Sequence, residues 1–132
     1  PDDLNGAGGD ILERVRAFFE KKTTEAEQRG VNKNRLCFDP GIGFGKTNEE
    51  NFALIANPEK IRVPGTALLM AASRKRVIGA VCGNPPFEDR MAGTVAAHTA
   101  SVLFGADMVR AHDTFEAVQA ARVADAIKQF RK

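Results

Sequence analysis

The sequence predicts an α/β protein built around a parallel sheet, because apolar strand-like segments alternate with segments of helical periodicity. The predicted strands are "RLCFDP" (35–40), "TALLMAAS" (66–73) and "DMVRAHD" (107–113), and a helical segment follows each of them. This order is typical of β/α units. The strands are apolar along their length, which predicts that both faces of the sheet are covered.

The first helix is predicted over residues 10–30, ahead of the first strand. Asp10 and Glu13 match the capping box of a helix start, and Gly30 is suited to end the helix. Helical spacing predicts a buried stripe made of Ile11, Val15, Phe18 and Phe19.

Two more capping boxes mark helix starts after the first and third strands. Thr47 pairs with Glu50 in one of them, and Asp113 pairs with Glu116 in the other. The later helices are predicted over 48–60, 73–83, 87–105 and 114–130.

Length and composition favour one globular domain with a balanced charge. The 132 residues are 43% hydrophobic and 27% charged, and 19 basic against 17 acidic residues give a net charge of +2. This balance does not favour nucleic acid or a membrane surface as a partner. No apolar run approaches the ~20 residues of a membrane span, and no signal peptide is recognised. Cys37 and Cys82 form no metal-binding pattern; Cys37 is predicted to be a buried apolar residue, and a reducing cytoplasmic compartment is favoured.

The glycine-rich stretch "DPGIGFGKT" looks like a nucleotide-binding loop, but its spacing is wrong for one. A phosphate loop would need glycine at position 40, which is proline. The glycines at 41, 43 and 45 alternate and do not follow the dinucleotide pattern G-x-G-x-x-G. We interpret the stretch as a glycine turn that follows a strand, with Asp39 at the end of that strand.

Polar side chains follow all three predicted strands, at the sheet edge where α/β folds place their sites. The first strand ends at Asp39 and the glycine turn. The other two end in Ser73, Arg74 and Lys75, and in Arg110, His112 and Asp113. Clustered basic groups, with Lys46 as a possible addition, suit an anion, whereas a fixed carboxylate suits an aminopyrimidine edge. The strand ends therefore predict a heterocyclic ligand with an anionic tail, and a second ligand that carries a carboxylate.

Each of these residues also has a structural interpretation. Asp39 is suited to cap the following turn, and "SRK" to a solvated helix start. Arg110 has Asp107 and Asp113 as possible ion-pair partners, and Asp113 is also suited to a helix cap. The residues that remain open to a purely structural role are Phe44, His98 and His112, of which His98 is the one we expect to be structural.

The segments "DPGIGFGKTNEEN", "SRKRVIG" and "DRMAGTVAAHTASVLFGADMVRAHD", in this order and spacing, resemble the C-terminal part of dihydropteroate synthase. The similarity runs from Asp10 to the end of the chain. It implies the C-terminal portion of a (β/α)8 TIM barrel, namely its last three parallel strands with their helices. Residues 1–132 would then form a single partial pterin-binding domain.

The resemblance implies a reaction of folate biosynthesis. Its enzymes join 6-hydroxymethyl-7,8-dihydropterin pyrophosphate to 4-aminobenzoate and release 7,8-dihydropteroate and pyrophosphate. Mg²⁺ assists, and sulfonamides compete with 4-aminobenzoate. The resemblance also implies a cytoplasmic enzyme that is a homodimer in its full-length form, with no nucleic-acid or membrane partner.

Four residues are assigned to the pterin substrate by this resemblance. Asp39 would bind the aminopyrimidine edge, and Lys75 would hydrogen-bond to the pterin ring. Arg110 would lie against the pterin and, with His112, would hold the pyrophosphate. Lys75, Arg110 and His112 are the residues that we predict to be catalytic.

Four more residues are assigned to 4-aminobenzoate. Ser73 would lie at its carboxylate with Arg74 close by, and Gly43 and Phe44 would line its pocket. No covalent nucleophile is required for this reaction.

The chain departs from the family pattern mildly in sequence and strongly in length. Ala71 stands where glycine is common, and "RAHD" stands where Arg-Val-His-Asp is common. A complete barrel takes ~250 residues, and the N-terminal substrate loops, with the expected protein ligand of Mg²⁺, are not in this sequence. The chain alone is expected to be incomplete for catalysis. The alternatives are a non-catalytic pterin-binding or regulatory domain and a pterin-dependent methyltransferase domain. The basic "SRK" and "RAHD" segments argue against the methyltransferase, because such an enzyme has no pyrophosphate to bind.

Overall fold

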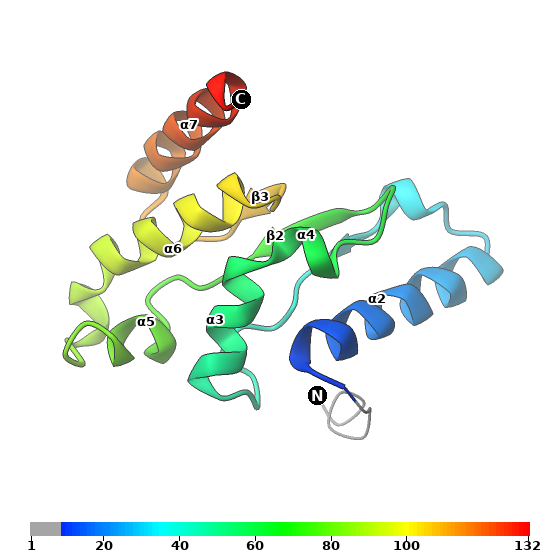
Figure 1. Cartoon of the computed structure of the whole chain (residues 1–132), viewed down its shortest axis with the longest axis horizontal. Helices are drawn as coiled ribbons and strands as arrows, with labels where there is room; N and C mark the ends of the chain where they lie inside the picture. The colour runs from blue at the N-terminus through cyan, green and yellow to red at the C-terminus, as the bar shows by residue number, and fades with distance from the viewer. Residues whose placement is uncertain (1–8) are drawn as a thin grey trace.

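A computed structural model describes residues 9–132 and shows a three-stranded parallel sheet in the order β1-β2-β3 (Figure 1). The strands are β1 (Cys37–Phe38), β2 (Ala67–Met70) and β3 (Met108–Val109). Cys37 pairs with Ala67, and Leu69 pairs with Met108. The parallel α/β architecture is confirmed. The strands are shorter than predicted: Arg35 belongs to a 3₁₀ turn, and the residues that follow Phe38, Met70 and Val109 are not paired in the sheet.

The helices also follow the predicted order, with two interruptions and one helix that is shorter than predicted. The predicted helix 73–83 begins only at Arg76 and ends at Ala80, because residues 73–75 form a turn. The predicted helix 48–60 is divided where Pro58 forces the preceding Asn57 out of helical geometry (φ −133°, ψ 50°). The predicted helix 87–105 begins with a separate 3₁₀ turn. The elements are α2 (Ile11–Gln28), η1 (Lys33–Arg35), α3 (Asn48–Ala56), α4 (Pro58–Ile61), α5 (Arg76–Ala80), η2 (Phe87–Asp89), α6 (Met91–Leu103) and α7 (Thr114–Phe130).

Two of the three predicted N-terminal helix caps are present in the structure. The Asp10 carboxylate accepts the backbone N–H of Glu13 at 2.9 Å, and Thr47 and Glu50 form a complete capping box. The predicted box at Asp113 is wrong. Asp113 precedes α7 but makes no side-chain cap bond, because its carboxylate is bound to the guanidinium of Arg74.

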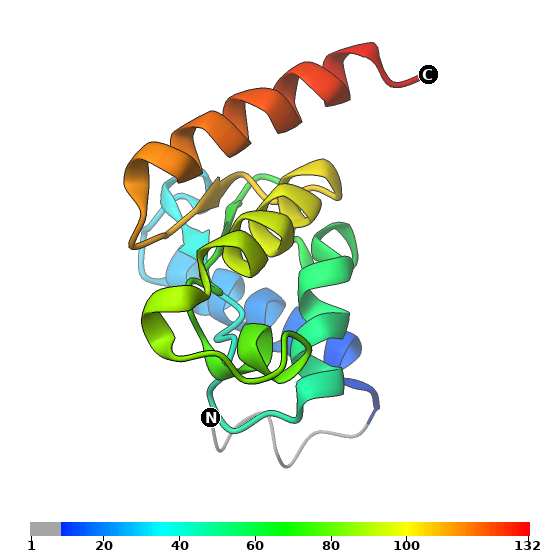
Figure 2. The same cartoon turned by 90° about the vertical axis from the view of Figure 1, so that its left-hand side faces the viewer.

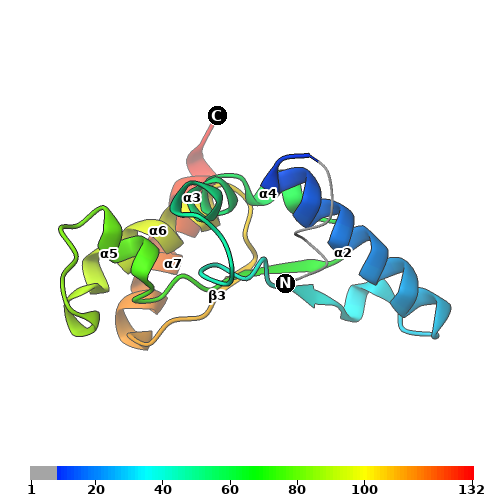
Figure 3. The same cartoon turned by 90° about the horizontal axis from the view of Figure 1, so that it is seen from below.

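Among residues 9–132, helices cover only one face of the sheet, so the prediction that both faces are covered is wrong for this part of the chain. Leu68 and Met70 point into the core, 1% and 0% exposed, where they join residues of α2 and α3. Figure 3 shows α3 and α4 on one side of β2, and its other side carries no helix in the part of the chain described. On that open face Met108 is 44% exposed and Cys37 is exposed. The prediction of a buried Cys37 is therefore wrong, since the residue faces the open side of an edge strand.

The last helix, α7, packs against α6 and lies beyond it, as Figure 2 shows. Its alanine side, which includes the fully buried Ala124, meets α6. Its other side leaves several large apolar residues exposed, namely Phe115, Val118, Val123, Ile127 and Phe130. Among residues 9–132, no helix is both long and apolar enough to cross a membrane.

Candidate functional site

The glycine turn after β1 is fixed by side chains on either side of it. Asp39 Oδ1 accepts the N–H of Gly41 at 2.8 Å, and Asn51 Oδ1, from α3, accepts the N–H of Gly43 at 2.9 Å. Gly43 has a φ of +86°, which side-chain-bearing residues rarely adopt, so glycine is suited to this position. The capping interpretation of Asp39 is thus correct for one oxygen, and the carboxylate remains exposed at the sheet edge.

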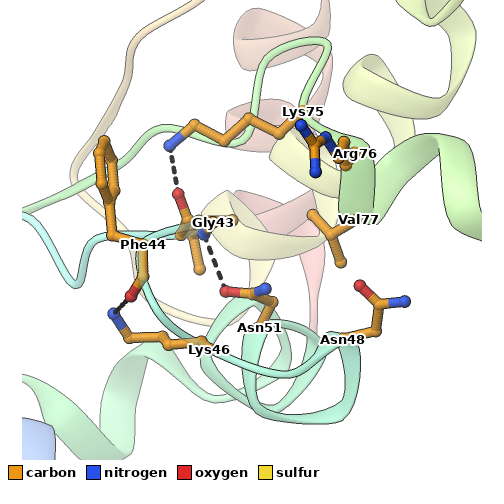
Figure 4. A pocket seen from close by; sticks show the side chains of 9 residues that line it. Gly43, Phe44, Lys46, Asn48, Asn51, Lys75, Arg76 and Val77 are labelled. Atoms are coloured by element: carbon orange, nitrogen blue, oxygen red, sulfur yellow. Dashed lines mark hydrogen bonds between the residues drawn. The ribbon is translucent and has the colours of Figure 1, made fainter.

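Lys75 connects the glycine turn to the end of β2. Its ammonium donates to the carbonyl oxygen of Ile42 at 2.5 Å and lies 5.0 Å from the ring centre of Phe44 (Figure 4). Burial lowers the pKa of Lys75; the nearby Asp39 carboxylate acts against this shift, and Arg110 adds to it. Three strand ends therefore place charged groups within electrostatic reach of one another, as the sequence predicted.

A cavity of about 520 Å³ opens beside this lysine, between the glycine turn and the start of α5. Figure 4 shows its lining, which includes the predicted residues Gly43, Phe44 and Lys75. The Phe44 ring is 64% exposed, so it lies at the cavity and not in the core. The lining residues that the sequence analysis did not assign are Ile42, Asn48, Asn51, Arg76 and Val77; Lys46, expected as a possible addition to the basic groups, lines the cavity as well.

Two of these unassigned residues had a usable signal in the sequence. Arg76 directly follows the Ser-Arg-Lys segment, at the start of a helix next to a strand end. Asn51 lies in the first turn of the helix that follows the glycine turn, where its amide reaches back to Gly43. Lys46 is different, because its ammonium donates to the carbonyls of Gly41 and Phe44 and so closes the turn on itself.

A second, smaller cavity of about 80 Å³ lies at the ends of β2 and β3. Ser73 and His112 form a pair on its wall: Ser73 Oγ lies 2.7 Å from His112 Nδ1 and accepts the His112 backbone N–H at 3.0 Å. Lys75 lines both cavities, and Arg110 lines this one. Ser73 thus lies with the residues assigned to pyrophosphate, not beside Phe44. Its assignment to the carboxylate of 4-aminobenzoate stays a prediction.

Arg74 already has strong partners. Its guanidinium bonds both oxygens of Asp113, at 2.8 and 3.2 Å, and lies 5.1 Å from the ring centre of Phe87. The Arg74 hydrogen bonds lower the pKa of Asp113. Both carboxylates considered as partners of Arg110 are therefore occupied, because Asp107 pairs with Arg62. The assignment of Arg74 to a substrate also stays a prediction.

His98 lies behind the site. It is 3% exposed, and its Nε2 accepts the backbone N–H of Ala72 at 3.0 Å. Burial, with a smaller contribution from the charge of Lys75, lowers the pKa of His98 to about 4. The imidazole is therefore neutral at pH 7, as suits the structural role expected for it.

No group of three or more histidine, cysteine, aspartate or glutamate side chains within residues 9–132 is arranged to hold a metal ion. The described side chains therefore offer no clustered ligand set for Mg²⁺. The basic residues at the strand ends are suited to an anion and not to a cation.

The sequence model for "Pterin binding enzyme" matches residues 2–112. The chain belongs to the pterin-binding enzyme family. This match covers all of the strand ends that form the two cavities, from the glycine turn to His112.

Individual relatives agree with the family. The chain is 37% identical over 119 residues to the dihydropteroate synthase of Synechocystis sp., covering 90% of this chain and 41% of that protein. The Escherichia coli dihydropteroate synthase is 35% identical over 117 residues, which cover 89% of this chain and 41% of the enzyme. A Xanthomonas albilineans dihydropteroate synthase, solved with 4-aminobenzoic acid, superposes with a TM-score of 0.88 at 36% identity. That alignment covers 100% of this chain and 48% of the solved one. The chain thus spans less than half the length of these relatives.

Proposed function

We propose that this chain supplies the C-terminal part of a dihydropteroate synthase substrate site. The observation that carries the proposal is the position of Lys75, whose ammonium joins the glycine turn to the β2 end and which lines both cavities. A pterin held by Asp39 and Lys75 would present its pyrophosphate to the smaller cavity. The aromatic amine would approach from the larger one, beside Phe44.

The pterin contact follows from donor and acceptor chemistry. The exposed Asp39 carboxylate offers acceptors for the paired N–H donors of an aminopyrimidine, and the Lys75 ammonium offers a donor for ring acceptors. Because Lys75 is already bound to the Ile42 carbonyl, its position is set before a ligand arrives. This arrangement limits the reorganisation that binding requires.

The reaction itself is a substitution at the pterin methylene carbon. The amine nitrogen of 4-aminobenzoate forms the new C–N bond, and the C–O bond to pyrophosphate breaks with its electron pair on the leaving oxygen. The nitrogen then loses a proton to solvent. Arg110 and His112 would stabilise the negative charge on the departing pyrophosphate, while the cavity beside Phe44 would orient the amine.

The larger cavity also suits the carboxylate of 4-aminobenzoate. Arg76 is exposed on its wall opposite the Phe44 side, whereas Lys46 lies on the Phe44 side with its ammonium bound to the Phe44 carbonyl (Figure 4). A relative was solved with 4-aminobenzoic acid and another structure of that protein with 7,8-dihydropteroate. Both support this pair of ligands for the proposed site.

The proposal includes further properties that rest on the family resemblance. They are assistance by Mg²⁺, which when bound would neutralise pyrophosphate charge, competition by sulfonamides, a homodimer in the full-length protein and a cytoplasmic location. No described residue is assigned to the metal.

The test is a urea melt followed by far-UV circular dichroism, with and without 6-hydroxymethyl-7,8-dihydropterin pyrophosphate and Mg²⁺. We expect the ligand to raise the midpoint, because binding to the native state stabilises it. Asp39→Asn should reduce the shift, whereas Asp125→Asn, on the exposed surface of α7, should keep it. If the unmodified chain unfolds cooperatively but its urea midpoint is the same with and without the ligand, the proposal is contradicted.

A further inference from the structure

Three polar side chains on one side of α6 bind the backbone of the turn that carries Ser73, Arg74 and Lys75. Arg90 directly precedes α6, and Thr94 and His98 lie within it; the three are spaced four residues apart, so they follow one another along one side of the helix. We call these three residues the α6 clamp.

Each member of the clamp holds a different backbone group. His98 Nε2 accepts the N–H of Ala72 at 3.0 Å. Thr94 Oγ1 accepts the N–H of Arg74 at 2.9 Å, and Arg90 Nη1 donates to the carbonyl oxygen of Arg74 at 3.0 Å. The clamp therefore binds the backbone on both sides of Ser73, at Ala72 and at Arg74.

The clamp is itself held in place. Thr94 is 3% exposed and its hydroxyl donates to the carbonyl of Arg90 at 2.7 Å, so the donor and one acceptor site are both used. Arg90 Nε donates to the carbonyl of Pro85 at 2.9 Å. Gly79 of α5 leaves the room that Arg90 needs, because a Cβ there would lie 2.9 Å from Arg90 Nε.

The backbone that the clamp holds is a strained one. Arg74 has a φ of +56°, in the left-handed region that residues other than glycine, asparagine and aspartate rarely occupy. Such a conformation persists only where the surroundings determine it. Both backbone groups of Arg74 are bound by the clamp, and its side chain is bound by Asp113.

This turn decides where the flanking side chains point. On one side of Arg74, Ser73 reaches His112, and on the other side Lys75 reaches the carbonyl of Ile42 in the glycine turn. A relaxed Arg74 would rotate the peptide units on both sides and would move these two side chains apart from their partners.

We propose that the α6 clamp positions the Ser73–Lys75 turn for ligand binding, with Thr94 as its central residue. The inference rests on the proposed function for the identity of the ligand. None of the three clamp residues lines either of the two cavities of the candidate site, so they act as positioning residues through the backbone of Arg74.

The deciding variants are Thr94→Val, which keeps the shape but removes the hydroxyl, and Thr94→Ser, which restores it. Ser101→Ala is the matched control. Ser101 lies on the same helix, is fully buried and donates to the Ile55 carbonyl of α3, away from the turn. The two readouts on the 132-residue chain are hydrogen exchange of the Arg74 amide, by NMR, and the affinity for the pterin pyrophosphate with Mg²⁺.

We expect Thr94→Val to speed exchange at Arg74 and to weaken ligand binding, each on the order of tenfold, since a part-buried N–H loses its acceptor. Thr94→Ser should restore both, and Ser101→Ala should change neither, even where it lowers overall stability. Equal effects of Thr94→Val and Ser101→Ala, or an unchanged Arg74 amide in Thr94→Val, would overturn the proposal.

The two proposals fail in different ways. If the unmodified chain folds but does not bind the pterin pyrophosphate, the proposed function fails, while exchange at Arg74 still decides whether the clamp holds the turn. If Thr94→Val does not fold, Arg90→Lys takes its place, because lysine keeps the charge but lacks the planar fork that reaches both Arg74 and Pro85. Faster exchange at Arg74 is then expected because the Arg74 carbonyl loses its donor and the turn is held less firmly, and unchanged exchange would count against the clamp.

Discussion

Neighbouring residues of β2 point to opposite faces of the sheet, and the two faces differ in how far they are buried. Leu68, on the helix-covered face, is 1% exposed and belongs to the hydrophobic core. Leu69, the next residue, points to the open face and pairs with Met108, which is 44% exposed. Strand alternation alone separates these environments. Burial on one face thus stabilises the fold, while the candidate site lies at the end of the strand, where hydrogen bonds add to the burial of Ala72 and Ser73.

The largest expected effect is on stability, and it comes from shortening the leucine on the covered face of β2 and not the one on the open face. Leu68→Ala removes side-chain atoms from the packed core, so we expect the free energy of unfolding to fall by about 2–5 kcal/mol. Leu69→Ala removes the same atoms from the open face, and a loss of about 1 kcal/mol or less is expected. Urea melts of both variants measure the difference. Equal losses would mean that the open face is covered in solution.

The second prediction concerns His98, which joins the core to the end of β2. Its pKa is about 4 in the folded chain, against 6.5 for an unperturbed histidine side chain, so unfolding takes up a proton between these values. The contribution of neutral His98 is therefore complete above about pH 6.5 and is lost as the pH falls toward 4. We expect the free energy of unfolding to be about 2 kcal/mol lower at pH 5 than at pH 7.5.

His98→Gln is the control for this pH dependence, because the glutamine amide oxygen can accept the Ala72 N–H without titrating. The variant should keep most of its stability between pH 7.5 and pH 5. If the free energy of unfolding of His98→Gln falls between pH 7.5 and pH 5 as much as that of the unmodified chain, a group other than His98 causes the pH dependence.

The sequence was sufficient for the parts of the fold that depend on local pattern. Strand–helix alternation predicted the parallel sheet, and the Thr47–Glu50 spacing predicted a capping box that forms as expected. The polar residues at the three strand ends were also identified before their geometry was known. What local pattern missed were contacts between distant segments, such as the capture of Asp113 by Arg74, which removed a predicted helix cap.

The same limit explains the wrong prediction for Cys37 and the absence of the α6 clamp from the sequence predictions. The apolar strands predicted cover on both faces of the sheet. Whether the second face is covered depends on which other segments are present, so the exposure of Cys37 could not be deduced from its neighbours. Arg90 and Thr94 look like ordinary residues at a helix start. Their role depends on the left-handed backbone of Arg74, and nothing in the Ser-Arg-Lys segment indicates that conformation.

A smaller effect is expected at the start of β3, where polar contacts hold the sheet edge. The Asp107 carboxylate accepts the Leu68 N–H at 2.8 Å and pairs with Arg62. Burial acts to raise the pKa of Asp107, but these two partners outweigh it and the net shift is downward. Its contribution is thus present above the ordinary carboxyl pKa and is lost as the pH falls through the lowered one. Asp107→Ala should lower the free energy of unfolding by about 1 kcal/mol at pH 7. A loss as large as that of Leu68→Ala would contradict the view that burial dominates here.

The smallest effect is expected far from both faces, on the exposed side of α2. Arg16 and Glu20 form an ion pair at 2.7 Å with side chains that are 40% and 53% exposed. Water and salt screen such pairs, so Glu20→Gln should change the free energy of unfolding by less than about 0.5 kcal/mol. Urea melts in low and high salt measure this, and the small difference should vanish in high salt. A change above about 1 kcal/mol would mean that surface charge on α2 stabilises the chain as strongly as contacts at the sheet. The ranking from Leu68 to Glu20 would then no longer follow from burial.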